Sequence, residues 1–234
     1  DGERVAVLSR NRPAYVDLFF ATGKTGGVLA PLSHRLAPGE LVQMLNDVDP
    51  ALLVVEEPFE AVVEAVLAHD DRSFDASVYA LPTDGETEFP PLASSLPADG
   101  SVVDAVSLGL DDPHLFLHTG GSTGVPKETV VTHGAIYWNS LNTITAWGLR
   151  DDDVSPMVFP MFHTGGWNVL TIPLFHMGGQ VTIAREFDPE RMLSVIESQQ
   201  ATVFVAVPAM LRMMTDADGW ADADLSSLRF AKSG

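Results

Sequence analysis

Short apolar segments alternate with segments of helical periodicity along the first part of this chain. Residues 51–55 form a fully apolar run, which is typical of a strand buried on both faces of a parallel sheet. Similar β-rich runs lie at residues 4–8 and 28–32. The helical patterns cover residues 14–22, with Gly23 as the expected stop, 38–45 and 59–68. Strands that alternate with helices predict an α/β fold of mixed, mainly parallel sheets flanked by helices.

The amino-acid composition changes in the middle of the chain. Residues 70–112 are rich in Asp, Ser, Pro and Gly, and we expect a connecting segment there with one short strand at 77–81. After this segment we expect a strand at 113–118. Thr132 can cap the N-terminus of a helix over 133–147. We therefore predict a first α/β subdomain over residues 1–145 and the first part of a second over residues 150–234.

A stretch of 31 residues, 154–184, carries no Asp, Glu, Lys or Arg. Prolines, glycines and histidines interrupt it well before the ~20 apolar residues that a membrane-spanning helix needs. We expect a strand at 157–160, a helix at 167–175 and a strand at 180–184. Beyond it, the patterns predict helices at 191–199 and 208–214 and strands at 201–207 and 229–232.

The composition argues against several classes of protein. A net charge of −19 argues against a nucleic-acid binder and against binding to an anionic membrane, because both need excess Lys and Arg. With no cysteine there is neither a disulfide nor a thiolate site, and we expect a cytoplasmic protein. Only Lys24, Lys127 and Lys232 are lysines, and an acidic, lysine-poor surface leads to the hypothesis of a salt-adapted organism.

The most specific feature is the glycine-rich segment HTGGSTGVPK at residues 118–127. Its glycines let the backbone come close to a ligand, and its amides, hydroxyls and one ammonium group suit a phosphate. It is not a Walker A loop, because Val125 and Pro126 separate Lys127 from Gly124. The chain does contain one Gly-Lys-Thr, at residues 23–25, but the first glycine of that motif is missing.

This segment resembles the signature of the AMP-forming adenylate enzymes, which include acyl-CoA synthetases, luciferases and peptide-synthetase adenylation domains. Residues 24–32, 159–163, 207–211 and 228–234 are similar to further elements of the family, in the same order. His118 stands where an aromatic residue is usual, and Glu128 replaces a glycine. The resemblance therefore extends over nearly the whole chain and implies the large N-terminal domain of that fold.

The resemblance implies ATP as a substrate, with Mg²⁺, and coenzyme A as co-substrate. Lys127 and Thr123 are the expected catalytic residues, and Thr119 is a weak candidate for a metal contact through Mg-ATP. The expected phosphate-binding residues are Thr119, Gly120, Gly121, Ser122, Thr123, Gly124 and Lys127.

Residues 162–167 indicate a branch of the family. Amino-acid-activating domains carry an aspartate here, in a Phe-Asp context. This chain has Phe162-His163 instead, so the resemblance favours the acyl- and aryl-CoA synthetases. In that branch His163 would line the pocket of the carboxylate substrate, together with Gly165, and Trp167 would act as a gate of an acyl tunnel. The implied activity is a fatty acid–CoA ligase that proceeds through an acyl-adenylate.

Several alternatives stay open at this point. The chain could be a non-catalytic α/β nucleotide-binding or interaction module, or belong to an aryl-CoA ligase or a luciferase-like enzyme. The resemblance also implies that a C-terminal catalytic domain lies outside these residues, so we expect the isolated chain to be inactive. The expected ligands are a small carboxylic acid, ATP and CoA, without a transmembrane segment; a homodimer is left open.

Overall fold

The computed structural model describes residues 2–97, 104–119 and 127–233. The chain divides into two compact units, Asp1–Ala135 and Ile136–Gly234, and each is considered by itself. Most of the glycine-rich segment, residues 120–126, lies outside the described residues.

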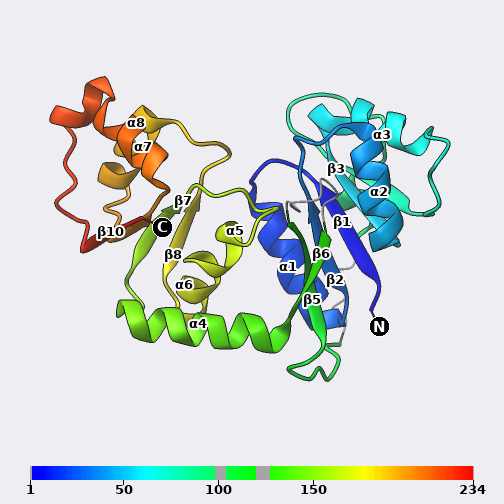
Figure 1. Ribbon diagram of the computed structural model, residues 1–234, viewed down its shortest axis with the longest axis horizontal. Coiled ribbons are helices and arrows are strands. Elements are labelled where there is room, and N and C mark those ends of the chain that lie inside the picture. Colours follow the sequence, from blue (N-terminus) through cyan, green and yellow to red (C-terminus); the bar gives the residue numbers. More distant parts are fainter. Residues whose placement is uncertain (1, 98–103, 120–126, 234) are drawn as a thin grey trace. The chain divides into compact units, whose positions relative to one another are not determined.

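The first unit is built on a six-stranded sheet with the order β4-β3-β1-β2-β5-β6 (Figure 1). The strands β1 to β5 run parallel to one another, and β6 runs antiparallel to its neighbour β5. This arrangement confirms the predicted α/β class. The strands are β1 (Arg4–Leu8), β2 (Val28–Leu32), β3 (Leu52–Glu56), β4 (Ser77–Leu81), β5 (Pro113–Thr119) and β6 (Lys127–Thr132).

The helices of this unit follow the strands. Proline opens both α1 and α2, where its fixed φ suits the first turn and its missing N–H costs nothing. The prediction that α1 ends at Gly23 is wrong: the helix continues to Thr25, and Gly26 ends it at φ 75°. The helices are α1 (Pro13–Thr25), α2 (Pro38–Val48) and α3 (Glu60–Leu67), with 3₁₀ turns at Glu57–Phe59 and Leu92–Ser95.

Gly23 is needed for packing rather than for helix termination. A Cβ atom at this position would lie 2.8 Å from Nε2 of His114, on β5. The imidazole occupies this space and lies 2.9 Å from the carbonyl oxygen of Phe19. The missing side chain therefore lets α1 approach β5 closely.

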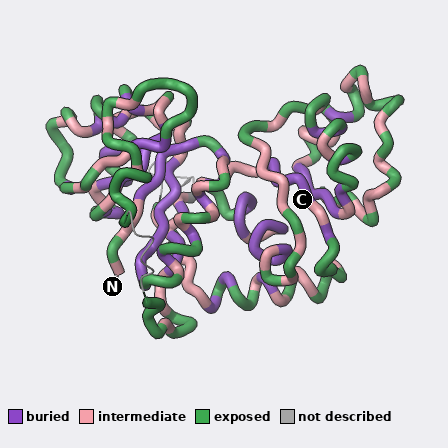
Figure 2. The backbone as a smooth tube through the Cα atoms, turned by 180° about the vertical axis from the view of Figure 1, so that it is seen from behind, coloured by how far each residue is buried: buried purple, intermediate pink, exposed green. Residues whose placement is uncertain are grey.

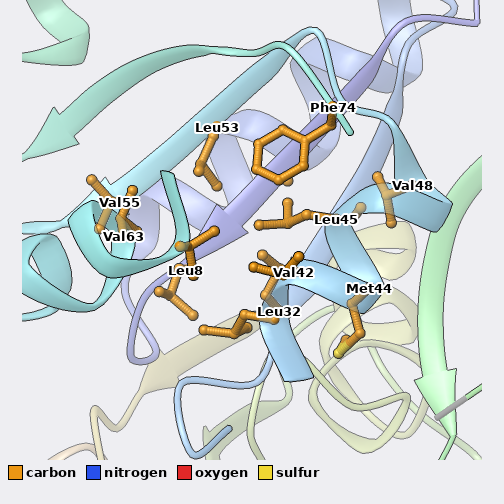
Figure 3. Packing of buried hydrophobic residues seen from close by; sticks show 14 residues of the cluster. Leu8, Leu32, Val42, Met44, Leu45, Val48, Leu53, Val55, Val63 and Phe74 are labelled. Atoms are coloured by element: carbon orange, nitrogen blue, oxygen red, sulfur yellow. The ribbon is translucent and has the colours of Figure 1, made fainter. Parts of the chain in front are cut away.

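The core of the first unit lies between the sheet and helices α2 and α3. Figure 3 shows Leu8, Leu32 and Leu53 of the sheet meeting Leu45 of α2 and Val63 of α3. All of these side chains are at most 1% exposed, and each contributes about 1.5–3 kcal/mol to stability by its burial. Figure 2 shows the strands of this sheet as buried segments. The packing holds the strand ends, and hence the loops that follow them, in place.

The second unit contains two short parallel ladders, β7 with β8 and β9 with β10. Helix α4 crosses the boundary between the units. The strands are β7 (Val154–Met157), β8 (Gln180–Ile183), β9 (Val203–Val205) and β10 (Phe230–Lys232). The helices are α4 (His133–Trp147), α5 (Gly165–Asn168), α6 (Thr171–Met177), α7 (Pro189–Ser198) and α8 (Pro208–Thr215), with a 3₁₀ turn at Asp218–Ala221.

The charge-free stretch 154–184 differs from its prediction in detail. Its first strand is β7, which ends at Met157, where the predicted strand begins. The predicted helix over 167–175 is two short helices, α5 and α6, because the turn at Val169 and Leu170 interrupts it. Within the described residues, none of the helices has the length and apolar character needed to cross a bilayer.

Candidate functional site

The ends of the glycine-rich segment lie in one antiparallel hairpin. Thr119, the last residue of β5, pairs with Lys127, the first residue of β6, and His118 pairs with Glu128. The segment is therefore closed at its base by the β5–β6 ladder, a strand pairing that the sequence patterns did not predict. The predicted phosphate-binding residues between them lie outside the described residues: Gly120, Gly121, Ser122, Thr123 and Gly124.

This hairpin leaves the sheet at its carboxyl edge. Strand β5 runs parallel to β2, with Leu29 opposite Leu115, so β1, β2, β3 and β5 all end on the same side of the sheet. Strand β1 has β2 on one side and β3 on the other, so the strand order reverses at β1. Open parallel sheets bind ligands at the carboxyl ends of strands, next to the point where the strand order reverses. The geometry therefore favours this edge as a ligand site.

The His118–Glu128 pair has unusual electrostatics. Burial lowers the pKa of His118 to about 4, although the nearby charge of Asp47 acts in the opposite direction. Burial and Asp47 both raise the pKa of Glu128, while Arg4 lowers it. Among the described residues, neither ring nitrogen of His118 has a hydrogen-bond partner. The imidazole is thus neutral at pH 7 and adds no positive charge beside Lys127.

The far end of the hairpin is held by a helix cap and a ring stack. The hydroxyl of Thr132 accepts a hydrogen bond from the amide of Ala135 at 3.1 Å, which confirms Thr132 as the cap of α4. His133 stacks on His114 with 4.3 Å between the ring centres and 8° between the planes. Since His114 also contacts α1, these contacts anchor the hairpin to the body of the first unit.

A buried carboxylate organises the neighbouring strand ends. Glu56, the last residue of β3, is 0% exposed, and its Oε2 accepts from the Ser9 hydroxyl at 3.1 Å and the Arg10 amide at 2.8 Å. A guanidinium nitrogen of Arg12 lies 3.6 Å from its Oε1. The sequence analysis did not single out these residues. The available signal was that polar and charged residues directly follow each apolar strand, as with His34 after β2.

The predicted substrate-pocket residues are neighbours in sequence but differ in environment. Gly165 lines a small pocket of the second unit with Phe159, Val169 and five other residues. The His163 side chain is exposed, and its Nδ1 accepts from the Gly165 amide at 3.1 Å. Trp167 is 0% exposed, and its indole N–H donates to the Met161 carbonyl at 2.6 Å. Trp167 therefore belongs to the core of this unit, with its polar atom satisfied.

No cluster of three His, Asp or Glu side chains suited to a metal ion occurs in residues 2–97, 104–119 and 127–233. The carboxylates at the carboxyl edge are engaged with amides and arginines, as Glu56 illustrates. The assignment of Thr119 to Mg-ATP stays a prediction.

Comparison with known proteins gives a consistent result. The profile of the AMP-binding enzyme family matches residues 1–234. Feruloyl-CoA synthase of an Amycolatopsis species is 35% identical over 228 residues, which are 97% of this chain and 43% of that protein. Indoleacetate–CoA ligase of Aromatoleum aromaticum is 35% identical over 98% of this chain and 44% of its own length. The chain thus spans less than half the length of these relatives.

Solved structures share the fold. The inhibitor-bound N-terminal domain of FACL13 from Mycobacterium tuberculosis has a TM-score of 0.85 at 27% identity, over 99% of this chain and 56% of that one. ATP-bound MatB from Rhodopseudomonas palustris has a TM-score of 0.84 at 26% identity, over 100% of this chain and 44% of that one.

Proposed function

We propose, from the premise that this chain belongs to the AMP-binding enzyme family, that its parent protein is an AMP-forming acid–thiol ligase. The observation that carries this proposal is the family-type HTGGSTGVPK segment, which begins and ends in a hairpin at the carboxyl edge of a parallel sheet. The relatives named as a CoA synthase and as CoA ligases support the same activity.

The proposed reaction has two halves. A substrate carboxylate attacks the α-phosphorus of ATP, and the bond to the leaving diphosphate breaks, which gives an acyl-adenylate. The thiol of CoA then attacks the acyl carbon, AMP leaves, and the thiol proton is released to solvent or to a base. The first half needs no general base, because the carboxylate is already ionised at pH 7.

The residues of the glycine-rich segment would act by position and charge. Backbone amides and the hydroxyls of Thr119, Ser122 and Thr123 would hold the β- and γ-phosphates, and Lys127 would add a positive charge there. Mg²⁺, when bound with ATP, would neutralise phosphate oxygens further. Because His118 would be neutral, the positive charge at the hairpin base would come from Lys127.

The substrate is proposed to be an aryl-substituted carboxylic acid rather than the fatty acid expected from the sequence. The relatives at 35% identity are named for feruloyl and indoleacetate groups, whereas a long-chain fatty acid–CoA ligase of Mycobacterium tuberculosis is 28% identical. His163 and Gly165 remain the proposed lining of the pocket. For Trp167 we propose support of the pocket wall, since its indole is buried and hydrogen-bonded.

The decisive experiment is release of diphosphate by the full-length protein with a panel of aryl and fatty acids. Lys127→Ala should lower adenylate formation by about 100-fold or more, because it removes charge stabilisation of the transferred group. Lys24→Ala is the matched control, since Lys24 is an exposed lysine of the Gly-Lys-Thr sequence on α1. Absence of diphosphate release with every acid would favour the non-catalytic module instead.

The 234-residue chain by itself is proposed to be inactive. It covers 43% of the length of a relative named feruloyl-CoA synthase and 44% of one named indoleacetate–CoA ligase. Carboxylate-dependent exchange of labelled diphosphate into ATP by this chain alone would contradict the proposal.

A further inference from the structure

The β5–β6 ladder is irregular at the end far from the glycine-rich segment. Its first two pairs lie two residues apart on β5 but one residue apart on β6, so His114 is an extra residue of β5, a β-bulge. Beyond it the pairing is regular up to the last pair, Thr119 with Lys127. An extra residue changes which residues of the two strands lie opposite one another. The bulge at His114 therefore sets the register in which Lys127 lies opposite Thr119.

The bulge residue packs closely against α1. Its Nε2 lies 2.9 Å from the carbonyl oxygen of Phe19, and a Cβ atom at Gly23 would lie 2.8 Å from the same nitrogen. Because a carbonyl oxygen only accepts, Nε2 carries the hydrogen of this bond. His114 is only 4% exposed. A hydrogen bond and close packing thus fix its ring on the first unit.

His133 contacts this ring from the other strand. It directly follows β6, and its ring lies parallel to that of His114, as described above. Its amide donates to the carbonyl oxygen of Asp112 at 3.0 Å, and the Gly134 amide donates to that of Leu110 at 2.7 Å. The Nε2 atom of His133 is buried and has no hydrogen-bond partner among the described residues. The stack therefore joins the two strands at the bulge.

The surroundings of the stack favour two neutral rings. Burial lowers the pKa of His114 to about 4, the bond to Phe19 opposes this, and the charge of His133 lowers it further. Burial also lowers the pKa of His133, while Asp112 raises it. Two protonated rings with 4.3 Å between their centres would repel each other. The stack is therefore complete at pH 7 and unfavourable in acid.

The other charged or titratable residues around the stack do not balance such a charge. Helix α4 contains no Asp, Glu, Lys or Arg, and on β5 and β6 these groups lie at the opposite end of the ladder. On α1, the Tyr15 hydroxyl is bonded to the carbonyl oxygens of Val7 and Ser9. The remaining ones on α1 and in the turn before β5 are exposed: Asp17, Lys24 and Asp111. Asp112 is thus the carboxylate that acts on the stack.

We propose that the stacked rings of His114 and His133 are a pH-dependent anchor of the β5–β6 hairpin, and that only the neutral stack keeps Lys127 in its register. Both are positioning residues, which act through the place of Lys127, and this part of the inference rests on the proposed function. The folded pKa values lie below the ordinary value of 6.5, so the anchor is complete above pH 6.5. Each pH unit below it favours the released form by up to about 10-fold per ring, until the folded value is reached.

The test measures hydrogen exchange of the full-length protein by mass spectrometry, corrected for the intrinsic effect of pH, in peptides that cover β5 and β6. Between pH 8 and pH 5 their protection should fall by about 10-fold or more in the wild type. In His133→Phe, which keeps a flat ring but cannot be protonated, the fall should be at least about 3-fold smaller, since one titrating ring is gone. An equal fall in both proteins would overturn the anchor.

Two further variants complete this measurement. His69→Phe makes the same change at a partly exposed histidine of the first unit and should behave as the wild type does. Gly23→Ala should lower the protection already at pH 8, because its Cβ displaces the His114 ring. If His133→Phe does not fold, His133→Gln provides a second neutral, planar side chain, and the same smaller fall is expected. Unchanged protection at pH 8 in Gly23→Ala would count against the packing that fixes the bulge.

The pH profile of diphosphate release tests the link to Lys127. Between pH 8 and pH 5.5, kcat/KM for ATP should fall about 3-fold more in the wild type than in His133→Phe. Equal pH profiles, with the exchange difference present, would overturn the positioning of Lys127. Absence of diphosphate release with every acid would contradict the proposed activity instead, while the exchange data would still decide for or against the anchor.

Discussion

Each unit of the molecule contains a fully buried carboxylate beside an arginine, yet the two sites differ. In the second unit, the Asp153 carboxylate accepts hydrogen bonds from Nη2 of Arg229 at 2.5 Å, from its Nε at 3.0 Å and from the Thr202 hydroxyl at 2.6 Å. In the first unit, the Glu56 carboxylate accepts hydrogen bonds from the Ser9 hydroxyl and the Arg10 amide and forms an ion pair with Arg12. Both carboxylate oxygens of Asp153 are bonded to the Arg229 guanidinium, whereas Glu56 is bonded to the backbone amide of Arg10 and has the Arg12 guanidinium 3.6 Å away.

The difference teaches that a buried carboxylate can be satisfied in two ways. Asp153 is bonded mainly by the side chain of one arginine, which ties two segments together. Glu56 is bonded by a hydroxyl and a backbone amide, so it fixes the backbone where β1 ends. The two sites should therefore respond differently when one partner is removed.

The largest effect is expected for Arg229→Ala. Loss of the guanidinium leaves the Asp153 carboxylate buried and without its main partner, which should cost about 3–5 kcal/mol of the free energy of unfolding of the second unit. Urea unfolding followed by fluorescence would measure it. Arg212→Ala, at an exposed position on α8, is the control and should change stability by less than about 0.5 kcal/mol. Equal losses in both variants would show that the bidentate pair has no special role.

Glu56→Gln should have an intermediate effect, about 1–3 kcal/mol in the first unit. The amide keeps the shape and one acceptor oxygen, but it weakens the bonds to Ser9 and the Arg10 amide and removes the charge that faces Arg12. Denaturant unfolding measures the loss. Glu64→Gln on α3 serves as the control, because its side chain is exposed. A neutral Glu56→Gln would argue against a carboxylate-organised strand edge.

Acid should reduce the stability that the ionised Asp153 carboxylate contributes to the fold. Burial raises the pKa of Asp153, but hydrogen bonds from Arg229 and Thr202 outweigh this and leave the pKa below its ordinary value of 3.8. Because the folded state holds the ionised form more strongly, this stabilisation is complete above pH 3.8 and is lost as the pH falls through the lower folded value. The stability gap between the wild type and Asp153→Asn should therefore shrink in that range. A gap that stays constant down to pH 2 would contradict the assignment.

The smallest change in stability is expected for Arg10→Gln. Its guanidinium has no carboxylate partner among the described residues, so the free energy of unfolding should stay within about 0.5 kcal/mol of the wild type. Thermal unfolding of the two proteins provides the measurement, and their unfolding temperatures should nearly coincide. A large loss of stability would make Arg10 a structural residue like Arg229.

The fold was predictable wherever the pattern is local. The β2 and β4 strands and helix α4 match their predicted bounds, because apolar periodicity and the Thr132 cap act over a few residues. The end of α1 was not predictable, since Gly23 is required by His114, which is distant in sequence. Strand β6 was missed because none of its residues is fully buried, and the strand contains only two apolar residues, Val130 and Val131.

Parts of the candidate site were likewise predictable from the sequence, and other parts were not. The glycine-rich segment was recognisable because its residues are consecutive and resemble the signature of the family. The contacts of Glu56 were not, because Ser9 and Arg10 follow β1 whereas Glu56 ends β3, and only the sheet order brings these two strand ends together. His163, Gly165 and Trp167 were named from their spacing, yet spacing does not reveal that one side chain is exposed and another is buried.

The sequence by itself therefore determined the α/β class, the family and the glycine-rich segment, because short-range patterns and consecutive motif residues carry that information. Only the tertiary structure decided that β1, β2, β3 and β5 end at one edge, that Asp153 pairs with Arg229, and that Arg12 faces Glu56. The physical reason is that parallel pairing joins strands through long connections. The neighbours of a charged side chain then depend on the order of the strands, not on the residues beside it in the chain.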